Sequence, residues 1–154
     1  MARMPKIMGI VSIVVGVLAV VVGIAVFLVV RSELSSQRIT VSEDAPFLAG
    51  NQVTGPFTAY AEAIALSEHA EEIGGGKTYA ELPSDDPNRN KVMTADFLQA
   101  SLYTSVVAFG VCALIIALGI MFVLVGLTFR SLDERTRSLV ASSGDRAAEP
   151  VATA

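Results

Sequence analysis

Side chains able to perform acid–base, nucleophilic or metal chemistry are few and are separated along this chain. His69 is the only histidine. Glu72, one helical turn further on, could share a metal ion with it, but two ligands do not form a selective metal site. We therefore interpret His69 as a solvated residue on the face of a helix, and we predict no catalytic residue, no metal ion and no cofactor.

Other candidate motifs are incomplete. Cys112 is the only cysteine, which excludes a disulfide within the chain, and its apolar neighbours predict an inert thiol. The segment Gly74–Thr78 ends like the phosphate-binding loop G-x-x-x-x-G-K-[ST], but Glu71 stands where that loop requires its first glycine. The segment Asp85–Asn88 lacks the spaced ligands and the final glutamate of a calcium-binding loop, so we interpret it as a capping turn.

Two long apolar runs are the main structural feature of the sequence, and any functional residue must be positioned by them or by the segments next to them. Ile7–Val30 and Leu102–Phe129 contain no charged residue, and each exceeds the roughly 20 residues that a helix needs to cross a bilayer. Two buried helices in a soluble domain are the alternative, but a hydrophobic fraction of 53% and a mean hydropathy of +0.60 favour membrane insertion. We predict an all-α membrane protein and, without charges in the spans, no proton relay or ion path.

The first run could instead be a cleaved signal peptide, because Arg3 and Lys6 give it a basic start. Its apolar core is longer than the about 7–15 residues of such peptides, and Val29–Ser32 contains no small-x-small cleavage site. We therefore interpret the run as an uncleaved signal anchor.

Basic residues near the spans predict the orientation, because they favour the cytoplasmic side. Arg3 and Lys6 precede the first run, and Arg130, Arg135 and Arg137 follow the second, whereas the segment between the runs holds five basic residues against eleven acidic ones. Both termini are therefore expected in the cytoplasm. The predicted order is a cytoplasmic head at 1–6, a transmembrane helix at 7–30, an extracytoplasmic insert at 31–101, a second transmembrane helix at 102–129, and a cytoplasmic tail at 130–154 that is disordered from about residue 141.

Small residues recur in both runs at steps of three and four, which places them on one helix face. In lipid, such residues favour helix association because they let two backbones approach closely. We predict an antiparallel hairpin with a left-handed crossing of about +20°. Its register pairs Gly9 with Gly126, Gly16 with Gly119, and Gly23 with Cys112. The predicted helix–helix seam comprises Gly9, Ser12, Gly16, Ala19, Gly23, Ser105, Ala108, Cys112, Ile115, Gly119, Phe122 and Gly126. Two alternatives stay open: the same faces pack between copies of the chain in a homo-oligomer, or glycine and alanine are simply common in membrane helices.

The insert is predicted to be small and mainly helical. Ile39–Val41 alternates like a short strand. Pro56 suits the first turn of a helix, which the glycines at Gly74–Gly76 would end. Glu62 and the other glutamates of this helix are expected to face water. Its apolar side chains form a face on which we expect a partner, comprising Phe57, Tyr60 and Ile64.

A family resemblance is carried by five stretches, which are Val41–Gly50, Gly55–Ala61, Gly76–Leu82, Met93–Ala95 and Ser105–Val111. They resemble small two-span membrane proteins of high-GC Gram-positive bacteria, which are often labelled aromatic ring-opening dioxygenases. The resemblance implies two spans and a location in the bacterial cytoplasmic membrane. Ring-opening dioxygenases need an iron site, commonly two histidines and a carboxylate, which a single histidine cannot supply.

The sequence therefore predicts a non-catalytic membrane protein that serves as an accessory or scaffold subunit of a larger complex. Its expected partners are the lipid bilayer and other membrane protein chains, and a homo-oligomer stays open. The acidic insert argues against nucleic acid as a partner. The alternative is a sensing module, in which the insert captures a ligand or cation and relays the event to the cytoplasmic tail. An enzyme would need a partner chain or a cofactor held by backbone groups.

Overall fold

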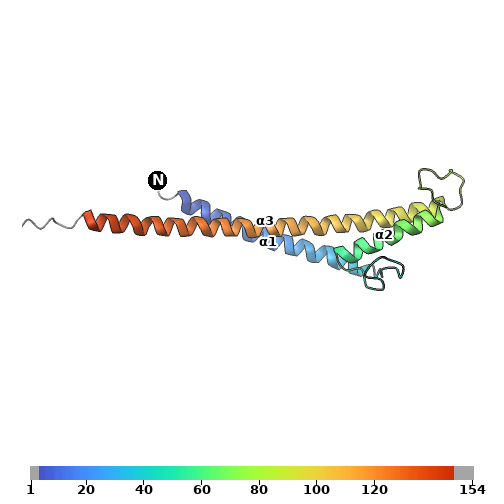
Figure 1. The fold of residues 1–154 in the computed structure, drawn as a ribbon, viewed down its shortest axis with the longest axis horizontal. Helices are drawn as coiled ribbons and strands as arrows, with labels where there is room; N and C mark the ends of the chain where they lie inside the picture. Colours follow the sequence, from blue (N-terminus) through green and yellow to red (C-terminus); the bar gives the residue numbers. More distant parts are fainter. Residues whose placement is uncertain (1–3, 148–154) are drawn as a thin grey trace, which may run out of the picture. The chain divides into compact units, whose positions relative to one another are not determined.

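The computed structural model describes residues 4–147 and, within them, the side chains of residues 6–132. It contains three α-helices and, in this described range, no β-strand: α1 is Met4–Ser36, α2 is Pro56–Ile73 and α3 is Arg89–Ala147 (Figure 1). The predicted all-helical class is therefore confirmed. The two predicted apolar runs lie in α1 and α3, and both helices are long and apolar enough to cross a membrane.

Contacts between residues divide the chain into two units. The first combines the described part of α1 up to Gly23 with α3 from Ile115 onward, and the second is the continuous segment Ile24–Leu114. Each long helix thus contributes one segment to each unit. The second unit also contains α2 and the two loops that connect the helices.

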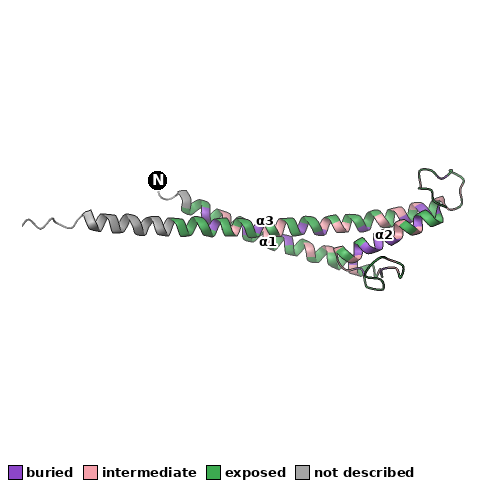
Figure 2. Ribbon diagram, viewed as in Figure 1, coloured by how far each residue is buried: buried purple, intermediate pink, exposed green. Residues whose placement is uncertain are grey.

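In the first unit, α1 and α3 pack through glycines. Gly9, Gly16, Gly119 and Gly126 are buried, whereas most of the large apolar side chains around them are exposed (Figure 2). A Cβ atom added to Gly9 would lie 3.1 Å from the carbonyl oxygen of Gly126, and one added to Gly16 would lie 2.5 Å from that of Gly119. Gly9 lies against Gly126 and Gly16 lies against Gly119, so a later residue of α1 contacts an earlier residue of α3. The two segments are therefore antiparallel.

The second unit has a small core of its own. Val41, Val53, Leu102 and Phe109 are buried in one cluster with Leu34 and three alanines of α2. The rings of Phe27 and Phe109 meet edge to face, with centroids 4.9 Å apart and planes at 61°. Alanines at the buried positions of α2 let the helix lie close to its neighbours, so the core is filled mainly by the loop and by α3.

The loop between α1 and α2 folds back on itself without forming a strand. Thr40 and Gln52 make an isolated antiparallel bridge, where a short strand was predicted for Ile39–Val41. The pairing does not extend because Arg38, at φ 52°, and Gly50, at φ 74°, leave the extended conformation two residues before each bridge partner. Leu48 also has a positive φ of 57°. Bulky residues rarely adopt this backbone region, so the surrounding contacts must hold Arg38 and Leu48 in place.

Local signals explain the bounds of α2. Pro56 is its first residue, and the hydroxyl of Thr58 accepts the backbone N–H of Gly55 at 3.2 Å, which caps the helix start. The helix ends at Ile73 because Gly75 and Gly76 take positive φ angles of 63° and 79°. The predicted helix from Pro56 to the glycine triplet is therefore present.

One side chain lies elsewhere than the sequence predicted. Glu62 was expected to face water but is only 6% exposed, because the loop between α1 and α2 covers that side of α2. Phe122, a member of the predicted seam, accepts the Ser12 hydroxyl through its carbonyl oxygen, while its side chain is 42% exposed. Val123 also contributes to the contact, because it lies against Gly16 beside Gly119.

The ends of the chain extend the predicted elements. α1 continues past residue 30 to Ser36, and α3 begins at Arg89 and runs without interruption through the second apolar run. α3 also reaches Ala147, whereas composition predicted disorder from about residue 141. The predicted head residue Arg3, the side chains of Arg135 and Arg137, and residues 148–154 lie outside what the structure describes.

Candidate functional site

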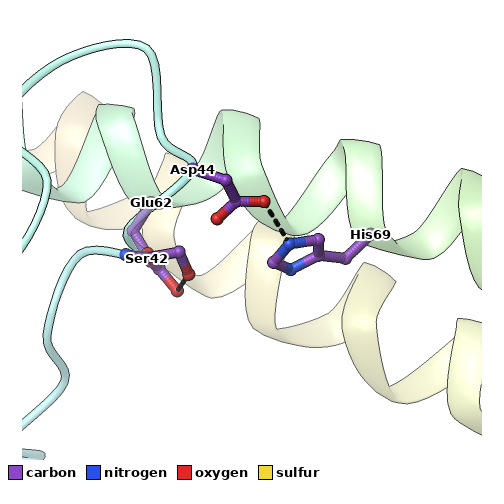
Figure 3. A network of polar contacts seen from close by, with 4 residues as sticks. All are labelled: Ser42, Asp44, Glu62 and His69. Atoms are coloured by element: carbon purple, nitrogen blue, oxygen red, sulfur yellow. Dashed lines mark hydrogen bonds and ion pairs between the residues drawn. The ribbon is translucent and has the colours of Figure 1, made fainter.

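Four polar side chains of the second unit form the polar cluster, which consists of Ser42, Asp44, Glu62 and His69 (Figure 3). Ser42 and Asp44 come from the loop before α2, two positions apart. Glu62 and His69 lie seven residues apart on α2, which brings them to the same face of the helix two turns apart. Each loop residue therefore meets one helix residue.

The first pair buries a carboxylate. Glu62 accepts the backbone N–H of Ser42 at 2.7 Å through one carboxylate oxygen and the Ser42 hydroxyl at 3.2 Å through the other. Removing a carboxylate from water is costly, and these two hydrogen bonds offset part of that cost. No lysine or arginine side chain within residues 6–132 makes an ion pair with Glu62. The loop is thus held to α2 by a buried, charge-assisted contact.

The second pair is exposed. Nε2 of His69 lies 2.6 Å from Oδ2 of Asp44, and both side chains contact solvent. The hydrogen bond with His69 holds the pKa of the Asp44 carboxyl below its ordinary value. His69 was predicted to be a solvated helix-face residue, and its partial exposure agrees with this, but its partner in the loop was not foreseen.

A small pocket adjoins the buried carboxylate. Its volume is about 120 Å³, below the roughly 300–1,000 Å³ of typical small-molecule sites. Its lining is mostly apolar and comprises Gln37, Ile39, Glu62, Leu66, Leu98, Ser101 and Leu102. The pocket therefore suits water better than an organic substrate.

The cluster does not form a catalytic relay in the part of the chain described. A nucleophile needs a base at hydrogen-bond distance, and the base needs a third group to orient it. The Ser42 hydroxyl is bonded to Glu62, and His69 is bonded to Asp44, so Figure 3 shows two separate pairs. No group of three metal-ligating side chains occurs among residues 6–132. What these contacts do is fasten the loop to the helix.

A second feature of the same unit is the aromatic row, defined as Phe47, Tyr60 and Tyr103. The ring centroids of Phe47 and Tyr60 are 6.3 Å apart, and those of Tyr60 and Tyr103 are 6.1 Å apart. The three rings come from the loop, α2 and α3, and each is between 38% and 45% exposed. Sequence reasoning placed Tyr60 on a partner face but could not bring it to Phe47 and Tyr103, since no local pattern encodes that proximity.

The rest of the predicted partner face is divided. Phe57 is 74% exposed and makes no aromatic contact within residues 6–132, whereas Ile64 is half-buried. The predicted face therefore presents Phe57 and Tyr60 to the outside.

The predicted seam residues differ in burial. Gly9, Gly16, Gly23, Cys112, Gly119 and Gly126 are buried, and Ser12, Ala19, Ser105, Ala108 and Ile115 are half-buried. In the first unit the structure brings Gly9 to Gly126 and Gly16 to Gly119, and the Ser12 hydroxyl donates to the carbonyl oxygen of Phe122 at 2.8 Å. The pairing of Gly23 with Cys112 stays a prediction.

Comparison of the chain with protein-family models, with curated proteins and with solved structures found no match. The resemblance to two-span membrane proteins of high-GC Gram-positive bacteria therefore stays a prediction. Function must be inferred from the residues of this chain.

Proposed function

We propose that the chain is a non-catalytic protein of the cytoplasmic membrane and that it serves as an accessory or scaffold subunit of a larger membrane complex. Its two apolar helices would cross the bilayer as an antiparallel hairpin, with both termini in the cytoplasm and residues 31–101 outside. The observation that carries the proposal is the exposure of apolar surface along α1 and α3.

That exposure separates a membrane helix from the core helix of a soluble protein. Only 11% of the most apolar stretch of α1 and 17% of that of α3 are buried. Exposing so many valine, leucine and isoleucine side chains to water would cost about 25 cal/mol for each Å². A bilayer removes this cost, and helices are the elements whose backbone groups are already satisfied within it.

Two further observations support a role as a subunit. Phe57 of α2 and Phe97 of α3 lie outside the predicted spans, yet both rings are largely exposed. Each ring offers a large apolar area outside the bilayer to another chain, and we propose both as contact residues. The polar cluster supports a non-catalytic role, because its hydrogen bonds join a loop to a helix and His69 is bonded to Asp44 instead of the Ser42 hydroxyl.

The test is affinity purification of the full-length chain, expressed at its native level and solubilised in mild detergent, with identification of the chains that co-purify. We expect a reproducible partner whose recovery falls in the Phe57→Ser and Phe97→Ser variants. Lys91→Ser, a change at an exposed polar position of α3, is the matched control and should leave recovery unchanged. Reproducible recovery of a lone chain would overturn the proposed subunit role.

The topology has its own test. Protease added to intact spheroplasts is expected to cleave within residues 31–101 and to spare residues 130–154. The opposite pattern would reverse the proposed orientation without affecting membrane insertion.

A second candidate function is sensing of a small cation by the insert, with relay to the cytoplasmic tail. It is favoured by one observation: the buried Glu62 carboxylate lines the 120 Å³ pocket. Calcium added to the full-length protein in detergent would then raise its melting temperature, and Glu62→Gln would abolish the increase. An unchanged melting temperature in the unsubstituted protein would exclude a calcium-sensing role.

A further inference from the structure

The aromatic row is an exposed cluster built from three separate segments. Tyr60 lies next to both Phe47 and Tyr103, and each of the three side chains keeps between 38% and 45% of its surface exposed. An apolar patch of this kind on a folded surface marks a binding site for another apolar surface.

The row continues a surface that faces lipid in the proposed membrane arrangement. Tyr103, Val107, Val111 and Leu114 follow one another along α3 at steps of four, four and three, which places them on one helix face. All four side chains are exposed. The last three lie inside the apolar run, where an exposed side chain contacts acyl chains. Tyr103 is thus the end of this face toward the insert, at the depth where tyrosine is enriched in membrane proteins.

The loop adds an apolar side chain next to the row. Leu48 follows Phe47, is exposed, and adopts a φ angle of 57°. Its carbonyl oxygen accepts the backbone N–H and the side-chain N–H of Asn51, both at 3.1 Å. These bonds hold the loop in a conformation that directs an apolar side chain outward, an arrangement that water does not stabilise.

The charges around the row restrict the kind of surface it fits. Residues 39–55 contain no lysine or arginine and include the acidic residues Glu43 and Asp44, and Arg38, nine residues before Phe47, is the one basic residue of the loop between α1 and α2. Attraction to anionic headgroups is therefore not what we expect to drive contact here. Tyrosine and phenylalanine bind the interfacial layer through their amphipathic or apolar rings and do not require a basic neighbour.

We propose that the aromatic row, together with Leu48, inserts into the interfacial layer of the bilayer that α3 enters, so that the loop rests on the membrane surface. This inference rests on membrane insertion in the proposed function and is independent of the subunit role. It assigns Tyr60, one residue of the predicted partner face, to lipid.

The chain contains no tryptophan, which permits a direct test. Three single-tryptophan variants of the full-length protein would be reconstituted in two sets of phosphatidylcholine vesicles, with acyl chains brominated close to the headgroup in one set and close to the bilayer centre in the other. Phe47→Trp reports on the row, and Val111→Trp reports on the proposed span. Ser84→Trp, at an exposed position of the loop before α3, is the control that should remain in water.

Bromine quenching of Phe47→Trp is expected to exceed that of Ser84→Trp by about twofold or more, as for an interfacial aromatic residue. Replacing a third of the lipid by phosphatidylglycerol, an anionic lipid, should not change it. Quenching of Val111→Trp alone would overturn this inference while leaving membrane insertion intact. Absence of quenching in both variants would overturn membrane insertion itself. Protection of Phe47→Trp from both bromine and aqueous iodide would show that protein covers the row, which also overturns the inference.

Discussion

Gly16 of α1 and Gly119 of α3 lie backbone against backbone. A Cβ atom on Gly16 would stand 2.5 Å from the carbonyl oxygen of Gly119, and one on Gly119 would stand 2.7 Å from that of Gly16. Gly9 and Gly126 repeat the arrangement seven residues away along each helix. Any side chain at these positions would force the helices apart, so glycine here sets the distance between them.

We expect Gly16→Leu to separate α1 from α3 in the first unit. Overpacking of this kind typically costs about 1–3 kcal/mol, and here the obstacle is backbone that cannot move aside. The measurement is crosslinking between cysteines introduced at Ser12 and Phe122 in a Cys112→Ser background. The Ser12 hydroxyl lies 2.8 Å from the carbonyl oxygen of Phe122, so these two positions face each other without placing a side chain on a packed glycine.

Gly110→Leu is the matched control for this experiment. Gly110 also lies on α3 within the apolar run, but a Cβ atom there would meet no atom within 4 Å. Crosslinking should be lost in Gly16→Leu and retained in Gly110→Leu. Equal crosslinking in the two variants would contradict the glycine contact.

Local and periodic signals predicted the helices well. Proline and the glycine triplet mark the ends of α2, and the long apolar runs mark α1 and α3, because these features act within a few residues. The close glycine pairs followed from spacing alone, since small residues seven positions apart lie on one face. The extent of burial was less well predicted: Phe122 contributes its carbonyl oxygen to the seam, but its side chain is 42% exposed, and Val123 packs against Gly16.

The polar cluster and the aromatic row could not be predicted in the same way. Glu62 is buried because a loop twenty residues earlier in the chain folds over it. No residue pattern within α2 predicts that contact. His69 and Asp44 are likewise joined across 25 residues. The strand expected at Ile39–Val41 was reduced to a bridge by positive φ angles at Arg38, which is not a glycine, and at Gly50.

Glu62→Ala is expected to destabilise the second unit. The substitution leaves the N–H and the hydroxyl of Ser42 without their acceptor, and an unsatisfied buried donor costs about 1–3 kcal/mol. Thermal unfolding of the full-length protein in detergent measures the change. Glu68→Ala, at an exposed position of the same helix, should alter the melting temperature far less. A Glu62→Ala protein no less stable than Glu68→Ala would mean that the buried contact contributes nothing.

Arg89 is expected to hold the loop before α3. Its Nη1 atom donates to the carbonyl oxygens of Tyr79 and Leu82, and its guanidinium carbon lies 4.1 Å from the centroid of the Tyr79 ring. Arg89→Lys keeps the charge but cannot reproduce the planar stacking and both hydrogen bonds, so about 1–2 kcal/mol of local stability should be lost. Hydrogen exchange of residues 78–88 should accelerate in this variant and stay unchanged in Lys91→Ala. Equal protection in all three proteins would count against this role.

Acid is expected to weaken the contacts of the insert. Hydrogen bonding with His69 lowers the pKa of Asp44, and the backbone N–H of Thr78, followed by its hydroxyl, lowers the pKa of Glu81. A lowered pKa means that folding favours the ionised carboxylate. The stabilisation is therefore present above the ordinary pKa values of about 3.9 and 4.3, and it is lost as the pH falls through the lowered ones. An NMR titration of the full-length protein in micelles should show the pKa of Asp44 below its ordinary value and rising in His69→Ala, while the pKa of Glu81 stays where it was. If the pKa of Asp44 were the same in His69→Ala as in the unsubstituted protein, the pairing of these two residues in solution would be disproved.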